Sequence, residues 1–380
     1  MHISPDREGP RRPRRGQRSR RLLVLAVVGL AVAGVLRARP AVLERQLARL
    51  LPTATPVPTA TPDAATIAAT ATAIQASGDQ SAAAEAWATA LALDPDLVEG
   101  HVARARILSF RRLHLQAVEA ARNAVRLAPE RPGAQASLAV ALDWAGDHEA
   151  AIAAAQAALD RRSDFVPALA ILAEAYAATG RWDEAAGAAE RAIGLDPRSP
   201  DAYRALGMNR EVRGDNAGAL EAYSQAVELM PNAGLYHLDV GRIHRGLRQR
   251  EAAIAAFSRA AEIDPRDPVA FDSLGLVAYD AREHAVAADH FRQAIALEPA
   301  YAPGYAHLGW VHYDLGEWAA AAEQLERAIQ LGAESPMHYY QLGLALAYAG
   351  ACDRARPMLR QAVELAPDVA MIRNGMKACP

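Results

Sequence analysis

Hydrophobic and small residues recur along this chain with a period of 34 residues, between residues 64 and 369. Within each period, one set occupies positions 4, 7, 8 and 11 and a second occupies positions 20, 24, 27, 28 and 30. Each set has the spacing of one face of an α-helix. The pattern therefore predicts two helices per period, joined by a short turn, and nine consecutive units.

Glycine and proline mark the ends of the predicted helices. Glycine at position 15 suits the left-handed residue that ends a helix, and proline at position 32 stops the second helix. The glycines at position 15 are Gly78, Gly146, Gly180, Gly214, Gly316 and Gly350. The prolines at position 32 are Pro95, Pro129, Pro197, Pro231, Pro265, Pro299 and Pro367. Each unit is thus predicted to be a helical hairpin.

Alanine explains how these hairpins are expected to pack. Positions 20 and 27 are alanine in all nine units, and the chain is 52% hydrophobic but only 6% aromatic. Alanine favours helices and lets neighbouring helices approach closely. A single hairpin buries little apolar area, so the hairpins are expected to stack on one another.

The unit 200–233 shows the pattern most fully. Its characteristic residues are Pro200, Tyr203, Leu206, Gly207, Ala219, Tyr223, Ala226, Leu229 and Pro231. This pattern resembles the tetratricopeptide repeat family over residues 64–369. The resemblance implies an all-α fold, an α-solenoid in which antiparallel helix pairs form a right-handed superhelix. The first two units depart most from the pattern, with Thr70 and Arg104 at position 7 and Arg112 at position 15.

A membrane segment is predicted before the repeats. Residues 22–36 are uniformly apolar and follow a basic tail, residues 1–21, that contains eight arginines. Fifteen helical residues span about 22 Å, which is short for a bilayer core, but flanking arginines can reach the interface. We therefore expect one transmembrane signal-anchor, with a cleaved secretory signal as the alternative. The arginine excess places the tail in the cytoplasm and the repeats outside.

The segments on either side of the repeats have separate predicted roles. Residues 37–63 are rich in threonine and proline, which is typical of an extended linker. Residues 370–380 are expected to form a C-terminal cap, because the last unit of a solenoid needs a solvating end. The expected location is the cell membrane of a bacterial envelope, crossed once.

Charge and motifs exclude several classes of function. The net charge is −3, although the residues before the repeats contain more arginines than acidic residues, so the repeats are acidic and a poor match for nucleic acid. The eleven histidines have no metal-ligand spacing, and phosphate-loop, dinucleotide and nucleophile motifs are missing from the sequence. We expect no enzymatic activity, no cofactor, no metal and no small-molecule substrate.

The resemblance implies which positions face a partner. The family presents positions 2, 5, 9, 12 and 13 of the first helix in a concave groove. The candidates at these positions in the later units are Arg204, Arg242, Arg245, Tyr279, Trp310, Tyr313, Tyr340 and Tyr348. Aromatic rings flanked by charges suit an extended peptide. Packing of the aromatics between units is the alternative. Trp318, at position 17, is expected to be a packing residue.

The two cysteines lie near the C-terminus. Cys352 begins the second helix of the ninth unit, and Cys379 would be position 10 of a tenth. Stacked units bring these positions to the same edge, so a disulfide between them is one hypothesis and two unrelated thiols are the other. A disulfide would suit an oxidising exterior.

Taken together, these features predict a membrane-anchored scaffold or adaptor on the outer side of the membrane, which binds a protein or peptide partner in its groove. Two alternatives stay open. One is a cell-envelope assembly factor for secretion, pilus or cytochrome maturation, and the other is a cytosol-facing adaptor of inverted topology.

Overall fold

The computed structural model describes residues 62–379, which belong to one compact unit of the chain. The predicted basic tail, the predicted anchor and almost all of the predicted linker lie outside the described residues. In the part that is described, every regular element is a helix, as an all-α solenoid requires. No helix among residues 62–379 combines the length and the hydrophobicity needed to cross a membrane.

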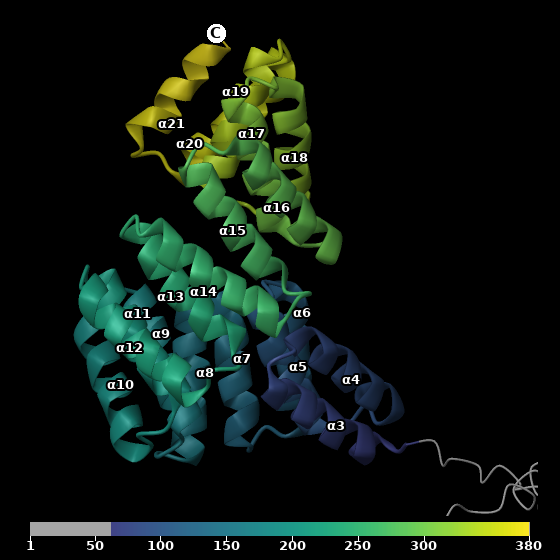
Figure 1. Ribbon diagram of the computed structural model, residues 1–380, viewed down its shortest axis with the longest axis vertical. Coiled ribbons are helices and arrows are strands. Elements are labelled where there is room, and N and C mark those ends of the chain that lie inside the picture. The colour runs from purple at the N-terminus through teal and green to yellow at the C-terminus, as the bar shows by residue number, and fades with distance from the viewer. Residues whose placement is uncertain (1–61, 380) are drawn as a thin grey trace, which may run out of the picture. The chain divides into compact units, whose positions relative to one another are not determined.

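The helices follow one another as nine antiparallel pairs and a short C-terminal addition (Figure 1). The pairs are α3 (Ala64–Ser77) with α4 (Gln80–Leu93), α5 (Val98–Phe110) with α6 (His114–Leu127), α7 (Pro132–Trp144) with α8 (His148–Arg161), α9 (Val166–Ala178) with α10 (Trp182–Leu195), α11 (Pro200–Val212) with α12 (Asn216–Leu229), α13 (Gly234–Gly246) with α14 (Arg250–Ile263), α15 (Pro268–Asp280) with α16 (His284–Leu297), α17 (Ala302–Asp314) with α18 (Trp318–Gln330), and α19 (Pro336–Tyr348) with α20 (Cys352–Leu365). The addition is α21 (Ala370–Gly375) and a 3₁₀ turn, Met376–Ala378.

Each pair turns at position 15 through a residue in the left-handed backbone region. Glycine supplies this conformation in six pairs, for example at Gly146, where φ is 88°. In the other three pairs an arginine takes it, with φ of 63° at Arg112, 59° at Arg248 and 64° at Arg282. An L-residue adopts this region only at a cost in free energy. The hairpin geometry therefore persists where its usual glycine is missing.

The packing inside a pair depends on positions 8 and 24 together. In the later pairs glycine at position 8 faces a large side chain at position 24, as Gly207 faces Tyr223. A Cβ on Gly207 would lie 2.6 Å from that ring, so only glycine fits. In the pairs α5–α10 both positions are alanine, for example Ala139 and Ala155, and all of these alanines are fully buried. The alanine-rich pairs are consequently held by close helix contact rather than by large side chains.

The first two pairs contact pairs far along the chain. The backbone N–H and the Oγ of Ser81 both donate to Oδ2 of Asp264 at 2.9 Å, and these two residues are buried. Arg111 pairs with Glu298 at 3.3 Å. These contacts join residues more than 180 positions apart, so α3–α6 lie beside the region of α13–α17 (Figure 1). The inner helices between them enclose a cavity.

The C-terminal addition covers the last pair. Helix α21 packs against α19 and α20 through Ile372, which is only 2% exposed. A disulfide joins Cys352, at the start of α20, to Cys379, with their Cα atoms 5.5 Å apart. This bond ties the end of the chain to the last hairpin.

Candidate functional site

The eight candidate groove residues lie in two separate regions of the structure. Arg204, Arg242 and Arg245 line the cavity inside the array. The aromatic residues from Tyr279 to Tyr348 lie on α15, α17 and α19, toward the C-terminal end. The groove thus contains two different sites, and each is described in turn.

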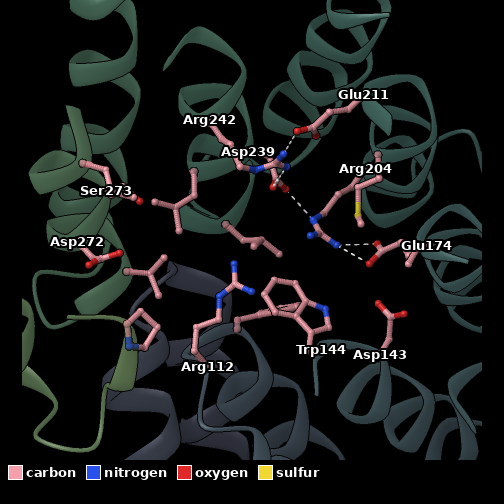
Figure 2. A pocket seen from close by; sticks show the side chains of 18 of the residues that line it. Arg112, Asp143, Trp144, Glu174, Arg204, Glu211, Asp239, Arg242, Asp272 and Ser273 are labelled. Carbon is pink, nitrogen blue, oxygen red and sulfur yellow. Dashed lines mark hydrogen bonds and ion pairs between the residues drawn. The ribbon is translucent and has the colours of Figure 1, made fainter. Parts of the chain in front are cut away.

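The cavity has a volume of about 660 Å³ and is lined mainly by the first helix of each pair from α7 to α17, together with the turn after α5. Arg204 is at its centre and is nearly inaccessible, with 5% of its surface exposed. Its Nε donates to Asp239 at 2.7 Å and its NH1 donates to both oxygens of Glu174 at 2.7 Å (Figure 2). Three helices, α9, α11 and α13, are connected through this one guanidinium.

A second arginine extends the same network. Arg242 on α13 donates to Oδ1 of Asp239 at 2.9 Å and also pairs with Glu211. The hydroxyl of Tyr223 donates to Glu211 at 2.9 Å. Burial raises the pKa of Tyr223, so this hydroxyl keeps its proton. The result is a continuous set of charge-assisted hydrogen bonds along one wall.

Trp144 lies between two guanidinium groups. The Cζ of Arg112 is 4.6 Å from its ring centroid and the Cζ of Arg204 is 5.1 Å from it. A ring face attracts cations through its quadrupole. Trp144 therefore holds two like charges near each other on the floor of the cavity (Figure 2).

The pKa values of the cavity carboxyls shift in opposite directions, depending on whether burial or nearby arginines have the larger effect. It raises the pKa of Glu174 to about 7, and Arg204 offsets part of that rise. The pKa of Asp143 is also raised by burial, although His148 lies 2.8 Å away. For Asp239, the attraction of two arginines outweighs burial and lowers the pKa. Asp239 is thus the firmly ionised member of the network.

Beside the cavity, an ion pair joins the second pair of helices to the central pairs. Arg106 on α5 donates to both oxygens of Asp201, at 2.8 and 2.6 Å, and the hydroxyl of Tyr236 donates to the same carboxylate at 2.7 Å. A bidentate arginine–carboxylate pair fixes geometry as well as charge. This contact joins α5 to α11 and α13 across the groove.

The second site is an aromatic strip formed by Tyr313, Trp318 and Tyr348. The ring centroid of Trp318 lies 5.2 Å from that of Tyr313 and 4.9 Å from that of Tyr348. Tyr348 is 53% exposed. The rings come from α17, α18 and α19, so two successive pairs build one surface. Trp318 is therefore part of this surface as well as a packing residue.

The remaining aromatic candidates lie deeper or are covered. The centroid of Trp310 is 4.5 Å from that of His307 and 6.2 Å from that of Tyr279, all half-buried between units. Tyr340 packs against the C-terminal addition, where a Cβ on Gly375 would lie 2.5 Å from its ring. Tyr279, Trp310 and Tyr340 therefore mainly support the packing of the last pairs.

Several residues in or beside the cavity were not among the candidates that the sequence pattern gave. Arg106, Trp144 and Glu174 occupy groove positions 9, 13 and 9 of units two to four, so the same positions would have found them. Arg112 and Asp239 occupy positions outside the groove set, and only the fold shows that they reach the cavity. Among residues 62–379 no three His, Cys, Asp or Glu side chains are grouped to hold a metal ion.

Comparison with protein families gives the assignment. Residues 145–208 match one model of the tetratricopeptide repeat, and residues 204–268 and 273–336 match another. The chain belongs to the tetratricopeptide repeat family. Repeat arrays of this family are scaffolds for protein interaction, and this general role applies to the chain. No curated protein matches it.

Solved structures with similar folds include the APC/C hetero-tetramer Cut9-Hcn1, with 18% identity and a TM-score of 0.58. The match covers 78% of this chain but 58% of the other, so the chain spans less than two thirds of that neighbour and shares the fold alone. Pseudomonas aeruginosa pilF matches with 20% identity and a TM-score of 0.46 over 56% of this chain and 97% of its own. The MamA protein matches with 27% identity and a TM-score of 0.36 over 45% and 93%.

Proposed function

We propose that this tetratricopeptide repeat protein is a membrane-anchored scaffold that binds a segment of a partner protein on its aromatic strip. The observation that carries the proposal is the exposure of Tyr348, whose ring packs at a tilted angle against those of Trp318 and Tyr313 on the last two pairs. Exposed, pre-ordered aromatic rings bind a partner with little loss of conformational freedom.

The charges around the strip suit an extended polypeptide. The hydroxyl of Tyr279 donates to Asp314 at 2.8 Å, and Arg282 pairs with the same carboxylate at 3.2 Å. These groups lie on the pair before the strip and at its edge; Arg282 and Asp314 are exposed and Tyr279 is half-buried. A partner segment would place apolar side chains on the rings and its polar backbone beside these groups.

The anchoring part of the proposal rests on the sequence of residues 22–36 and on the arginines before them. The positive-inside rule gives a cytoplasmic tail and repeats on the outer side of the membrane. The disulfide between Cys352 and Cys379 is consistent with that side, because such bonds persist in oxidising compartments.

The binding surface is tested by site-specific photo-cross-linking in native membranes. A photoreactive phenylalanine at residue 348 is expected to give a discrete cross-linked partner, and Tyr313→Ala is expected to reduce that product. The matched control is the same probe at Trp182, another exposed aromatic, 46% exposed, on a distant pair. Equal cross-linking at 348 and 182 would contradict the proposed surface.

The orientation is tested separately by adding protease to cells whose inner membrane is intact but accessible. Degradation of the repeats is expected if they lie outside. Complete protection, with digestion only after the membrane is broken, would establish a cytosol-facing adaptor instead.

A further inference from the structure

The guanidinium of Arg112 faces the cavity without a partner for its charge. Within residues 62–379 it has no hydrogen bond or ion pair, and its one specific contact is with the ring of Trp144. In Figure 2 it points into the middle of the cavity. The residue is exposed, and partial desolvation of the side chain by the surrounding hairpins lowers its pKa. An arginine that faces a cavity without a counter-ion is available to pair with an anion.

The acidic groups of the cavity are already bound to other residues. Each of the five carboxylates that line it has its own partner. The pairs are Glu174 with Arg204, Asp239 with Arg204 and Arg242, Glu211 with Arg242, Asp143 with His148, and Asp272 with His307 and Tyr301. Arg245, the other lining arginine, pairs with Asp280 at 3.2 Å. Among the described residues, Arg112 is therefore the one arginine lining the cavity that has no carboxylate partner.

The backbone at Arg112 makes this residue more notable. Position 15 is glycine in six of the nine units, and the left-handed φ of 63° disfavours any side chain there. Arg282 occupies the same position in unit seven but uses its charge on Asp314. Of the three arginines with this backbone conformation, Arg112 lines this cavity, whereas Arg248 and Arg282 do not.

The rest of the cavity has the size and lining of a small-molecule site. Its volume of about 660 Å³ lies within the range of ligand cavities. Apolar side chains form much of the wall away from Arg112, namely Met208, Val212, Leu235, Leu238, Leu276 and Pro303. Such a wall accepts an apolar body, whereas the guanidinium accepts a charged end.

We propose that this cavity binds a small organic acid, whose carboxylate pairs with Arg112 and whose apolar body lies against Leu235 and Leu238. A planar carboxylate matches the two parallel N–H groups of a guanidinium. One unmatched positive charge fits a monoanion, because the other lining arginines are already paired with carboxylates and would not match a second negative charge. The proposal is independent of the aromatic strip, which lies outside this cavity.

Calorimetric titration of the full chain in lipid nanodiscs tests the site, with empty nanodiscs as the blank. The probes are 4-phenylbutyrate, its neutral analogue 4-phenylbutanol, and the dianion 4-phenylbutyl phosphate. We expect saturable binding of the acid, and binding of the alcohol and of the phosphate weaker by about tenfold or more. A Kd for the acid weaker than about 1 mM would overturn the proposal.

Two glycine variants separate the role of Arg112 from that of the turn. Arg112→Gly restores the residue that most units have, so it preserves the hairpin, and it is expected to weaken binding of the acid by about tenfold or more. The matched control, Arg248→Gly, changes the same turn position outside this cavity and is expected to leave the Kd unchanged. Equal affinity of Arg112→Gly and the wild type would overturn the proposal, as would tighter binding of the alcohol or the phosphate.

Partner cross-linking through residue 348 is expected to be the same in Arg112→Gly as in the wild type. Its loss in this variant, together with retained binding of the acid, would show that Arg112 serves the partner site and not a small acid.

Discussion

The cavity and the aromatic strip are built from equivalent positions of successive repeats, yet they have opposite character. In the cavity, Arg204 is 5% exposed and its charge is matched by buried carboxylates. In the strip, Tyr348 is 53% exposed, and one side of its ring packs against the ring of Trp318. The difference shows that the exposure and the charge pairing of a groove residue depend on which helices pack opposite it.

The two regions are also held together by different means. The second pair supplies an opposite wall of the cavity through Arg112 and His114, and Arg106 and Ser81 join the first two pairs to α11 and to the end of α14. The strip has no such wall among the described residues, and its end is fixed by a disulfide and by α21. A substitution in one region should therefore change that region and leave the other unaltered.

Arg204→Met is expected to destabilise the central pairs by about 3–5 kcal/mol, because it leaves Glu174 and Asp239 buried without their counter-ion. Hydrogen exchange of α9, α11 and α13 measures the loss. The control is Arg259→Met, which breaks an exposed pair with Glu262 and should cost less than about 1 kcal/mol. Equal effects of the two variants would mean that the network is hydrated rather than buried.

Replacing Cys352 and Cys379 by serine is expected to destabilise the last pair by roughly 3–4 kcal/mol, since the bond closes a segment with a sequence separation of 27 residues. Hydrogen exchange in α19, α20 and α21 should increase. A reductant added to the wild type should reproduce this change and leave α9–α13 unaltered. Faster exchange in the central pairs would contradict the separation of the two regions.

Asp264→Ala is expected to loosen the first two pairs by about 1–3 kcal/mol, because the N–H and the hydroxyl of Ser81 lose their buried acceptor. The measurement is hydrogen exchange in α4. Glu262→Ala, on the same helix but exposed, serves as the control. Unchanged protection of α4 would show that other contacts close the cavity.

The stability of the cavity region should fall as pH rises from about 5 to 7. The folded state keeps a proton on Glu174 up to a pKa of about 7, whereas the unfolded chain releases it near the ordinary value of 4.5. The folded state thus binds more protons in this window, and the free energy of unfolding decreases by about 1–2 kcal/mol.

Glu174→Gln should flatten this dependence, as measured by urea midpoints at several pH values. Asp267, whose pKa burial raises to about 7, should contribute a remaining slope that Asp267→Asn removes. An unaltered slope in Glu174→Gln would contradict the assignment.

Tyr348→Ala is expected to change the free energy of unfolding by no more than about 0.5 kcal/mol, since the side chain is largely exposed. Chemical denaturation measures this effect. The same variant should nevertheless reduce partner capture, so stability and binding would be separated in the strip. A large loss of stability would place Tyr348 in the core of the last pairs.

The repeat pattern predicted much of the fold because its signals are local. Position 15 ends the first helix whether it is glycine, as at Gly146, or arginine, as at Arg112. The site was less predictable because it depends on distant pairs. Arg204 and Arg242, two of the groove candidates, line the cavity, but their carboxylate partners lie on neighbouring helices at spacings that no motif reveals.

The sequence alone predicts the helix pairs, their number between residues 64 and 369, and the close packing at alanine and glycine positions. These follow from periodicity and side-chain size, which act within one or two units. The contact of Ser81 with Asp264, and the cavity that the inner helices line, emerge only in the folded structure. Both depend on the small rotation between successive helix pairs, which adds up over several units. No local sequence pattern determines that total rotation.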